Sequence, residues 1–129
     1  MTKQKILVVD DSKTYLHFAV SALEKAGYST LSADNAWISS LVAKERPDLI
    51  LMDVQLGSVS GVAAVSVIRK RSFARDTCIL LHSSSAHDQL TELAHSCGAN
   101  GCLVKDGRAE SLVRAVKQAL AANQKAIVQ

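Results

Sequence analysis

The stretch ILVVDD, residues 6–11, decides the fold of this chain. Its four apolar residues, three of them β-branched, are typical of a short strand that is covered on both faces. Two carboxylates follow at the point where such a strand ends. Beyond them Leu16, Val20 and Leu23 recur with helical spacing, and Gly27 is placed to end that helix. The stretch therefore predicts a buried strand whose carboxyl end carries acidic groups and leads into a helix.

A short apolar run followed by an amphipathic stretch occurs five times along the chain. These runs predict strands at residues 6–9, 29–33, 49–52, 78–81 and 101–104, each followed by a helix. The second helix is expected to begin at Asp34 or Asn35, either of which is a good cap, and to stop at Pro47. A polar loop is expected from Gln55 to Ser60, and the chain is expected to fray from Gln124 onward.

Five strands that alternate with helices predict a parallel sheet with helices on both faces and right-handed crossovers. The strongly apolar first and third strands belong in the centre of the sheet, and the weak second strand suits an edge. This arrangement fits the doubly wound order 2-1-3-4-5, in which a ligand crevice lies beyond the carboxyl ends of strands 1 and 3. We therefore predict an α/β, flavodoxin-like domain over residues 1–123 with a short C-terminal tail at 124–129.

The composition is that of one soluble globular domain, with 129 residues, 48% of them hydrophobic and 21% charged. The apolar runs are too short to cross a bilayer, and the first run meets Asp10 and Asp11 too soon for a signal peptide, so a cytoplasmic location is expected. A net charge of +3 is too small to predict direct binding to nucleic acid. One basic cluster is expected to be a solvated helix end: Arg69, Lys70, Arg71 and Arg75.

The three cysteines are Cys78, Cys97 and Cys102, and no two of them form a CxxC pair. Reduced, idle thiols are the favoured interpretation. A zinc site that combines His95, Cys97 and Cys102 is an alternative. It is disfavoured because Cys102 falls within a predicted strand and no fourth ligand stands at metal-binding spacing.

Polar side chains stand at the carboxyl ends of four of the predicted strands. They are Asp10 and Asp11 after strand 1, Asp53 after strand 3, Ser83 after strand 4, and Lys105 after strand 5. These ends meet at one edge of a parallel sheet, so we expect the side chains to converge. Taken singly, each has an ordinary explanation, such as an aspartate that caps a helix. The combination, in chain order, favours a shared site.

Three carboxylates held together repel one another, and a hard divalent cation such as Mg²⁺ is the natural compensation. Lys105 can pair with a carboxylate or with a phosphoryl oxygen, and the Ser83 hydroxyl can donate a hydrogen bond to the same oxygen. This set of groups suggests formation of an acyl phosphate by attack of a carboxylate on phosphorus. Asp53 is the expected nucleophile, because the acidic pair on the other strand serves as metal ligands.

At this point the sequence resembles the receiver domain of response regulators in two-component systems, over nearly the whole chain from Lys5 to Ala122. The resemblance is carried by ILVVDDS (6–12), PDLILMD (47–53), Gly61, ILLHSS (79–84) and GANGCLVK (98–105). It implies the sheet order given above and a stand-alone, chemotaxis-receiver-like phosphoprotein rather than a turnover enzyme. It also implies phosphorelay from a histidine kinase or histidine phosphotransfer protein, and an output protein bound through the face formed by helix 4, strand 5 and helix 5. A homodimer is a further possibility.

The resemblance also assigns roles to individual residues. Mg²⁺ would be held by Asp11, Asp53 and the main-chain carbonyl of Gln55, with Asp10 acting through water. Asp53 would accept the phosphoryl group. Ser83 would follow that group on activation and Lys105 would pair with it. Gln55 and Ser85 would line the path of the hydrolytic water and tune the lifetime of the phosphate.

Three positions depart from the family pattern. Gly57 replaces the usual proline in the loop after the phosphoacceptor, which should loosen that loop. Asp106 replaces the proline that usually follows the lysine, so the customary cis peptide is not expected. Cys102 occupies the position of an aromatic side chain that commonly turns inward on activation, and a thiol cannot report burial in the same way.

These departures motivate an alternative function, a receiver-like interaction module that works without phosphorylation. Whether Asp53 accepts phosphate discriminates between the two functions. A small magnesium-dependent phosphatase is disfavoured, because such enzymes carry a second acid/base aspartate where this chain has Gln55. A flavin-binding domain is disfavoured too, since two acids stand where a phosphate needs hydrogen-bond donors.

Overall fold

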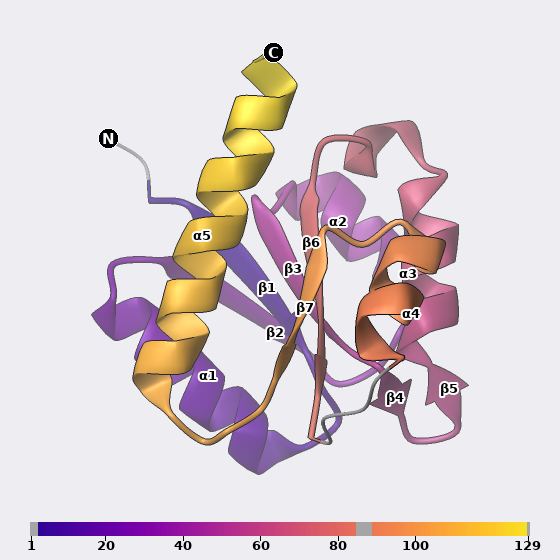
Figure 1. Cartoon of the computed structure of the whole chain (residues 1–129). Helices are drawn as coiled ribbons and strands as arrows, with labels where there is room; N and C mark the ends of the chain where they lie inside the picture. Colours follow the sequence, from indigo (N-terminus) through magenta and orange to yellow (C-terminus); the bar gives the residue numbers. More distant parts are fainter. Residues whose placement is uncertain (1–2, 85–88, 129) are drawn as a thin grey trace.

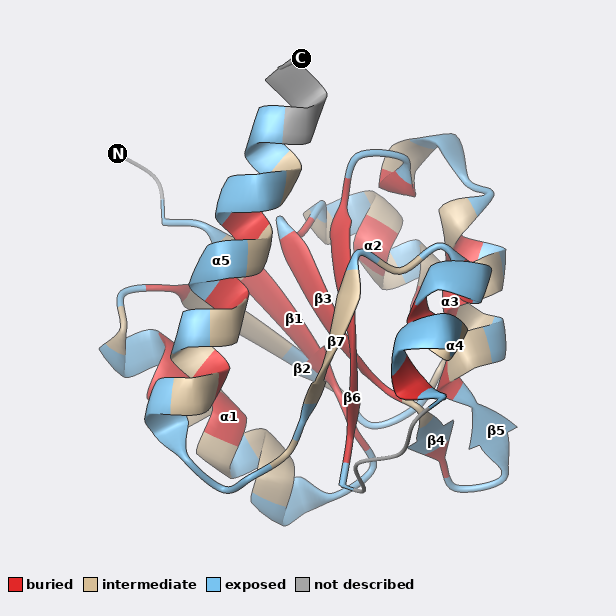
Figure 2. Cartoon of the chain, viewed as in Figure 1, coloured by how far each residue is buried: buried red, intermediate tan, exposed pale blue. Residues whose placement is uncertain are grey.

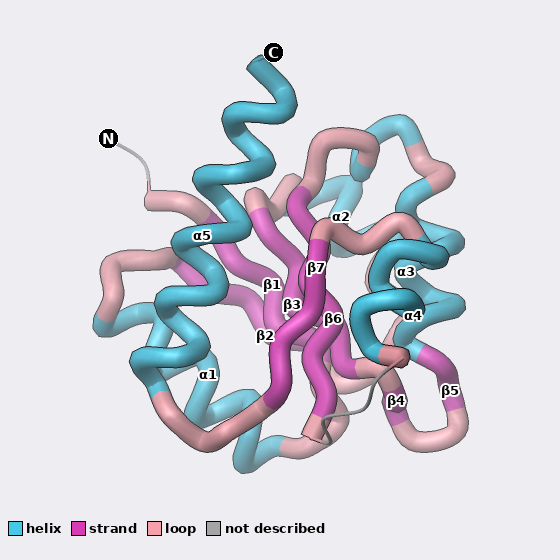
Figure 3. Tube along the Cα trace, viewed as in Figure 1, coloured by secondary structure: helices cyan, strands magenta, loops and turns pink. Residues whose placement is uncertain are grey.

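The computed structural model describes residues 3–84 and 89–128, with side chains described through Lys125. Figures 1 and 3 show a parallel sheet between two layers of helices. Its strands are β1 Lys5–Val9, β2 Ser29–Ala33, β3 Leu49–Asp53, β6 Cys78–Ser83 and β7 Gly101–Val104. The helices are α1 Lys13–Lys25, α2 Ser39–Glu45, α3 Gly61–Arg69, α4 Leu90–Cys97 and α5 Ala109–Val128, with a 3₁₀ turn at Ser72–Ala74. The sheet order is β2-β1-β3-β6-β7, which confirms the predicted order 2-1-3-4-5.

The hydrophobic core forms two layers, one on each face of the sheet. Alternate residues of β1 point to opposite faces, so that Ile6 and Val8 pack with α1 and α5 while Leu7 and Val9 pack with α2, α3 and α4. All of β3 is buried, as Figure 2 shows for the central strands. Each fully buried aliphatic side chain contributes about 1.5–3 kcal/mol relative to an exposed one. Burial on both faces explains why these strands read as continuous apolar runs.

Helix α2 begins at Ser39, four or five residues later than the sequence pattern predicts. Asn35 does not cap the helix, because its side-chain oxygen instead accepts a hydrogen bond from the backbone N–H of Trp37 at 2.9 Å. The residue at the N-cap position is Ile38, whose side chain is buried and makes no capping hydrogen bond. Tertiary packing of Ile38 therefore sets the start of this short helix and leaves Trp37 outside it.

The segment predicted as a loop at 55–60 is a small antiparallel hairpin, β4 Gln55–Leu56 and β5 Val59–Ser60. Its turn contains Gly57, which has a positive φ of 61°. The side-chain amide of Gln55 donates to the carbonyl of Gly57 at 2.6 Å and braces the turn. Ser60 then caps α3 by accepting a hydrogen bond from the N–H of Ala63.

The ends of two other helices also bear on the sequence predictions. Helix α5 continues to Val128, and both the domain boundary at residue 123 and the fraying from Gln124 stay predictions. Asp106 accepts a hydrogen bond from the N–H of Arg108 just before α5, and the described backbone contains no cis peptide bond. Ser85 and Asp88 have the spacing of a helix cap in the sequence and are predicted to cap α4. Both lie outside the described residues.

The side chain of Arg69 is not a solvated helix end, which corrects one part of the predicted basic cluster. Its guanidinium donates hydrogen bonds to backbone carbonyls and one side-chain oxygen near the starts of β6 and β7: Ala74, Thr77, Gly98 and Asn100. Arg69 thereby joins the end of α3 to its neighbours, while Lys70, Arg71 and Arg75 remain exposed. No helix within the described residues is long and apolar enough to span a membrane.

Gly61 lies where the start of α3 crosses the end of β3. A Cβ atom at this position would stand 1.7 Å from the carbonyl oxygen of Asp53, a distance that no side chain can occupy. The two backbones can approach this closely only without a side chain at residue 61. This contact fixes the path of the chain around Asp53.

We predict that Gly61→Ala lowers the free energy of unfolding by about 3 kcal/mol or more, because the backbone must move apart at Asp53. Gly27→Ala is the matched control. Unlike Gly61, Gly27 has a positive φ, of 100°, but a Cβ atom there would meet nothing within 4 Å, so backbone strain alone costs about 1 kcal/mol. Urea unfolding of the two variants measures the difference. Equal losses would show that the close approach at Gly61 is unimportant.

Candidate functional site

The carboxyl ends of β1, β3, β6 and β7 open onto one hollow, as the sequence pattern predicts. Its lining includes six of the predicted site residues: Asp10, Asp11, Asp53, Gln55, Ser83 and Lys105. Tyr15 from α1 completes the lining on one side. The parallel sheet brings these groups together because each one ends or follows a strand that runs in the same direction.

Asp53 ends β3 and is largely buried at the base of the hollow. One carboxylate oxygen accepts a hydrogen bond from the N–H of Gln55 at 3.3 Å, and the other lies 3.3 Å from the Lys105 ammonium. Burial raises the pKa of Asp53 above its ordinary value. The positive charge of Lys105 opposes this increase, and the negative charge of Asp10 adds to the increase. The carboxylate therefore carries a charge that its surroundings compensate incompletely, which favours a cation or an electrophile at this position.

Lys105 lies between two carboxylates. Its ammonium forms an ion pair with Oδ2 of Asp10 as well as the longer one with Asp53. Asp10 is wholly buried, and its other oxygen accepts a hydrogen bond from the N–H of Ser12 at 2.8 Å. The ammonium also lies 4.4 Å from the centre of the Tyr15 ring, within range of a cation–π interaction. One cation thus links the ends of β1, β3 and β7.

Asp11 is exposed, whereas Asp10 is buried. Its Oδ2 accepts a hydrogen bond from the N–H of Gly57 at 2.9 Å, which ties the β4–β5 turn to the end of β1. The replacement of proline by Gly57 was expected to loosen this loop. In the structure the backbone N–H that proline would lack is the donor of this hydrogen bond.

His82 is also buried at the site, and no role was predicted for it from the sequence. It pairs in register with Asp53, and its Nε2 lies 3.3 Å from the carbonyl oxygen of Val9 and 3.4 Å from Oδ2 of Asp10. Burial, helped by the charge of Lys105, lowers the pKa of His82 to about 4, so the ring is neutral at neutral pH. Its Nδ1 has no partner within the described residues. A polar ring just before Ser83 in an otherwise apolar run was the available signal.

Tyr15 was also missed, since its position on α1 carries no motif. Its ring packs edge-on against His82 with 5.0 Å between the ring centres. Burial first, and then the negative charges of Asp10 and Asp53, raise the pKa of its hydroxyl above the ordinary value. Tyr15 therefore supplies an aromatic wall and not a proton donor of enhanced acidity.

One predicted residue, Cys102, is not among the residues that line the hollow. Cys102 lies on β7, partly buried, with its sulfur 3.8 Å from the hydroxyl of Thr91. Ser85 falls outside the described residues. The zinc alternative gains no support, because the group of possible metal ligands found among the described residues consists of Asp10, Asp53 and His82. All three cysteines are free thiols, as expected.

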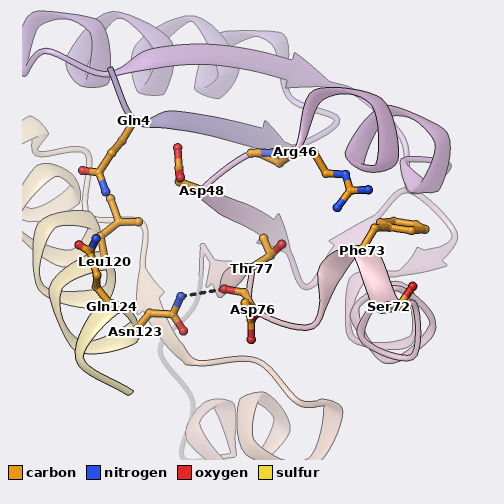
Figure 4. Close-up of a pocket in the computed structure, with 11 residues that line it drawn as sticks. Gln4, Arg46, Asp48, Ser72, Phe73, Asp76, Thr77, Leu120, Asn123 and Gln124 are labelled. Atoms are coloured by element: carbon orange, nitrogen blue, oxygen red, sulfur yellow. Dashed lines mark hydrogen bonds between the residues drawn. The ribbon is translucent and has the colours of Figure 1, made fainter. Parts of the chain in front are cut away.

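A second hollow lies at the amino-terminal ends of the strands, between α5 and the segment around the 3₁₀ turn (Figure 4). There Asn123 donates a hydrogen bond to the carbonyl of Asp76 at 2.9 Å, and the guanidinium of Arg46 lies 5.9 Å from the Phe73 ring centre. These contacts join neighbouring elements of the fold. The convergence of charged groups at the carboxyl ends makes that end the candidate site.

Comparison with known proteins agrees with this geometry. The family model for the response regulator receiver domain matches residues 6–117. The protein PilH of Pseudomonas aeruginosa is 27% identical over 118 residues, covering 91% of this chain and 98% of PilH. The chain spans about half the length of several transcriptional regulators that it also matches, 51% and 53% in two cases.

Solved structures show the same fold. The chemotaxis protein CheY4 of Vibrio cholerae superposes with a TM-score of 0.86 at 27% identity, covering 92% of this chain and 99% of that one. A response regulator from Burkholderia pseudomallei, solved with a phosphorylated aspartic acid and a calcium ion, has a TM-score of 0.79 at 25% identity. The superposition covers 97% of this chain and 71% of that one.

We predict that Lys105→Met lowers the free energy of unfolding by about 3 kcal/mol at neutral pH, because two carboxylates that are largely buried lose their cation. The loss should shrink as the pH falls, since Asp53, whose pKa is raised, takes up a proton and no longer needs a partner. Lys13→Met, at an exposed site on α1, serves as the control and should change stability little. Chemical denaturation at several pH values checks both; a loss independent of pH would contradict the electrostatic explanation.

Proposed function

Because the chain belongs to the response regulator receiver domain family, we propose that it accepts a phosphoryl group on Asp53 and passes the signal to a partner protein. The observation that carries this proposal is the buried carboxylate of Asp53 in ion-pair contact with Lys105. The donor would be a histidine kinase or a histidine phosphotransfer protein, in a cytoplasmic phosphorelay. The protein would act as a switch that is reset by hydrolysis and not as a turnover enzyme.

The residues present fit a divalent cation. Asp10, Asp11 and Asp53 surround the hollow with carboxylate oxygens, the ligands that Mg²⁺ prefers. The raised pKa of Asp53 indicates that the one nearby ammonium does not fully compensate this negative charge. We propose that Asp11, Asp53 and the carbonyl of Gln55 hold Mg²⁺, with Asp10 acting through water. When bound, Mg²⁺ would supply positive charge to the oxygens of the transferring phosphoryl group.

The proposed transfer forms a bond between a carboxylate oxygen of Asp53 and phosphorus. The bond from phosphorus to the donor's imidazole nitrogen breaks, and that nitrogen keeps the electron pair. Lys105, now paired with Asp10 and Asp53, would turn to the phosphoryl oxygens, and the Ser83 hydroxyl would donate a hydrogen bond to one of them. Attack by water at phosphorus would later restore the carboxylate and release inorganic phosphate.

The readout is proposed to use the face formed by α4, β7 and α5, with a homodimer as one possible form. Cys102 on β7 stands at the centre of this face, where its small thiol would take part in the switch in place of an aromatic ring. Gln55 and Ser85 are proposed to tune the lifetime of the phosphate. A receiver-like module that works without phosphorylation remains the competing function, motivated by Gly57, Cys102 and Asp106.

The first test adds acetyl phosphate to the protein with and without Mg²⁺ and measures the intact mass. We expect a magnesium-dependent gain of one phosphoryl group that disappears in Asp53→Asn, because the amide is not a nucleophile for phosphorus. Asp34→Asn, at an exposed position beyond β2, is the matched control and should be labelled like the wild type. If the wild type gains no mass under conditions that label a control receiver domain, the phosphorylation-independent module is favoured.

The second test concerns the metal ligands. Asp11→Asn keeps an oxygen that can accept the hydrogen bond from Gly57 and removes only the charge. We therefore expect Mg²⁺ affinity to fall by roughly tenfold or more, with little change in stability. Titration calorimetry measures the affinity and thermal unfolding measures the stability. An unchanged magnesium titration would remove Asp11 from the ligand set.

A further inference from the structure

Exposed apolar side chains gather in one place on this protein. The large hydrophobic residues that are exposed within the described part of the chain are Trp37 at 86%, Val67 at 56%, Val59 at 39% and Val104 at 38%. The first three line a single groove with a volume of about 470 Å³. Scattered exposed hydrophobics are ordinary, whereas three that converge on one hollow indicate a binding surface.

Three separate elements build the groove. Trp37 stands just before α2, Val59 lies on β5, and Val67 lies on the outer side of α3. Figure 1 shows α2 and α3 on the same face of the sheet, with the β4–β5 hairpin beside the start of α3. Between the large side chains the lining is small, with Ala63 and Ala64 among its members, which leaves room for side chains of another molecule.

The position of Trp37 is held by local structure and does not result from packing into the core. The Asn35 side chain accepts the hydrogen bond from the N–H of Trp37, and the next residue, Ile38, turns inward and is buried. The backbone therefore directs the indole outward at the edge of the groove. Tryptophan is among the residues most enriched at the energetic centres of protein interfaces.

The described lining of the groove carries one charged residue, and its charge is positive. Arg71 lines its end after α3, and Lys70 is exposed beside it. No acidic residue is among the described lining residues, and none of the ion pairs found in the described part of the chain includes Arg71. An occupant that complements this surface carries an apolar ridge flanked by carboxylates.

We propose that the groove binds an amphipathic helix of a partner protein, with its apolar ridge against Trp37, Val59 and Val67 and its acidic flank near Arg71. A helix places side chains i, i+3, i+4 and i+7 on one ridge, which suits a concave apolar surface. A second copy of this chain would bring two Arg71 side chains together at the same face, and the net charge of +3 adds to their repulsion.

This docking site is separate from the α4–β7–α5 face and does not depend on phosphorylation of Asp53. It does adjoin the acidic site, because Val59 belongs to the hairpin whose Gly57 N–H is held by Asp11. A partner on the groove would therefore contact the segment that follows the phosphoacceptor. Binding of a helical peptide is measured in the absence of phosphate, so failure of the proposed phosphorylation leaves its result unchanged.

The test uses a displayed library of helical peptides without aromatic residues, with apolar residues fixed at i, i+3, i+4 and i+7 and all other positions random. We expect selection on the wild-type protein to enrich glutamate and aspartate at the flanks. Trp37 is the sole tryptophan of the chain, so binding of a selected peptide should shift its emission to the blue as the indole leaves water. Anisotropy of a labelled peptide gives the affinity independently of this signal.

The variants distinguish the groove from other surfaces. Val67→Glu should weaken peptide binding at least tenfold, whereas Val104→Glu, at the exposed valine outside the groove, should bind like the wild type. Arg71→Glu should lower affinity for acidic peptides and raise it for peptides with lysine in place of glutamate. Thermal unfolding of each variant establishes that it is folded.

Several outcomes would overturn the proposal. They are a lack of enriched peptides, enrichment of basic flanks, and equal binding to Val67→Glu and the wild type. A blue shift of Trp37 with phosphatidylserine vesicles and none with peptides would assign the groove to a membrane. A blue shift that depends only on protein concentration, with dimers in sedimentation, would assign it to a second copy of the chain.

Discussion

The ion pairs of one ammonium, that of Lys105, hold the carboxyl end of the sheet together. Asp10 and Asp53 are buried on neighbouring strands, and two buried carboxylates without a cation would oppose the approach of β1 and β3. Lys105 comes from β7, at the other side of β6, so its side chain crosses the end of the sheet to reach them. The cost of burying these charges is tolerated because the same groups form the site.

This cluster is buried on one side and open on the other. On the buried side the rings of His82 and Tyr15 pack against each other beside the carboxylates, and burial keeps the imidazole neutral, so it adds no charge to the site. On the open side Asp11 is exposed and is linked to the β4–β5 turn. The site thus has a buried part, which holds Asp53, and an exposed part, which includes Asp11.

The hairpin after Asp53 connects this site with the rest of the surface. Gly61 lets α3 start directly against the carbonyl of Asp53, and the hairpin before it carries both Gly57 at the acidic site and Val59 at the groove. Contacts therefore connect the surroundings of Asp53 with two surfaces through different elements. One is the α4–β7–α5 face, through Lys105 and β7, and the other is the α2–α3 groove, through β5.

The sequence by itself determined the strands, their order and the convergence of Asp10, Asp53 and Lys105, because short apolar runs and parallel strand ends follow from local pattern and simple topology. Only the tertiary structure decided where α2 begins, because that depends on burial of Ile38, and only it showed the hairpin at 55–60, whose turn is bonded to Asp11 from 46 residues away. The contact of His82 with Asp10 and the groove beside Trp37 have the same origin. Each depends on contacts between segments that are distant in the sequence, and local sequence patterns carry no information about such contacts.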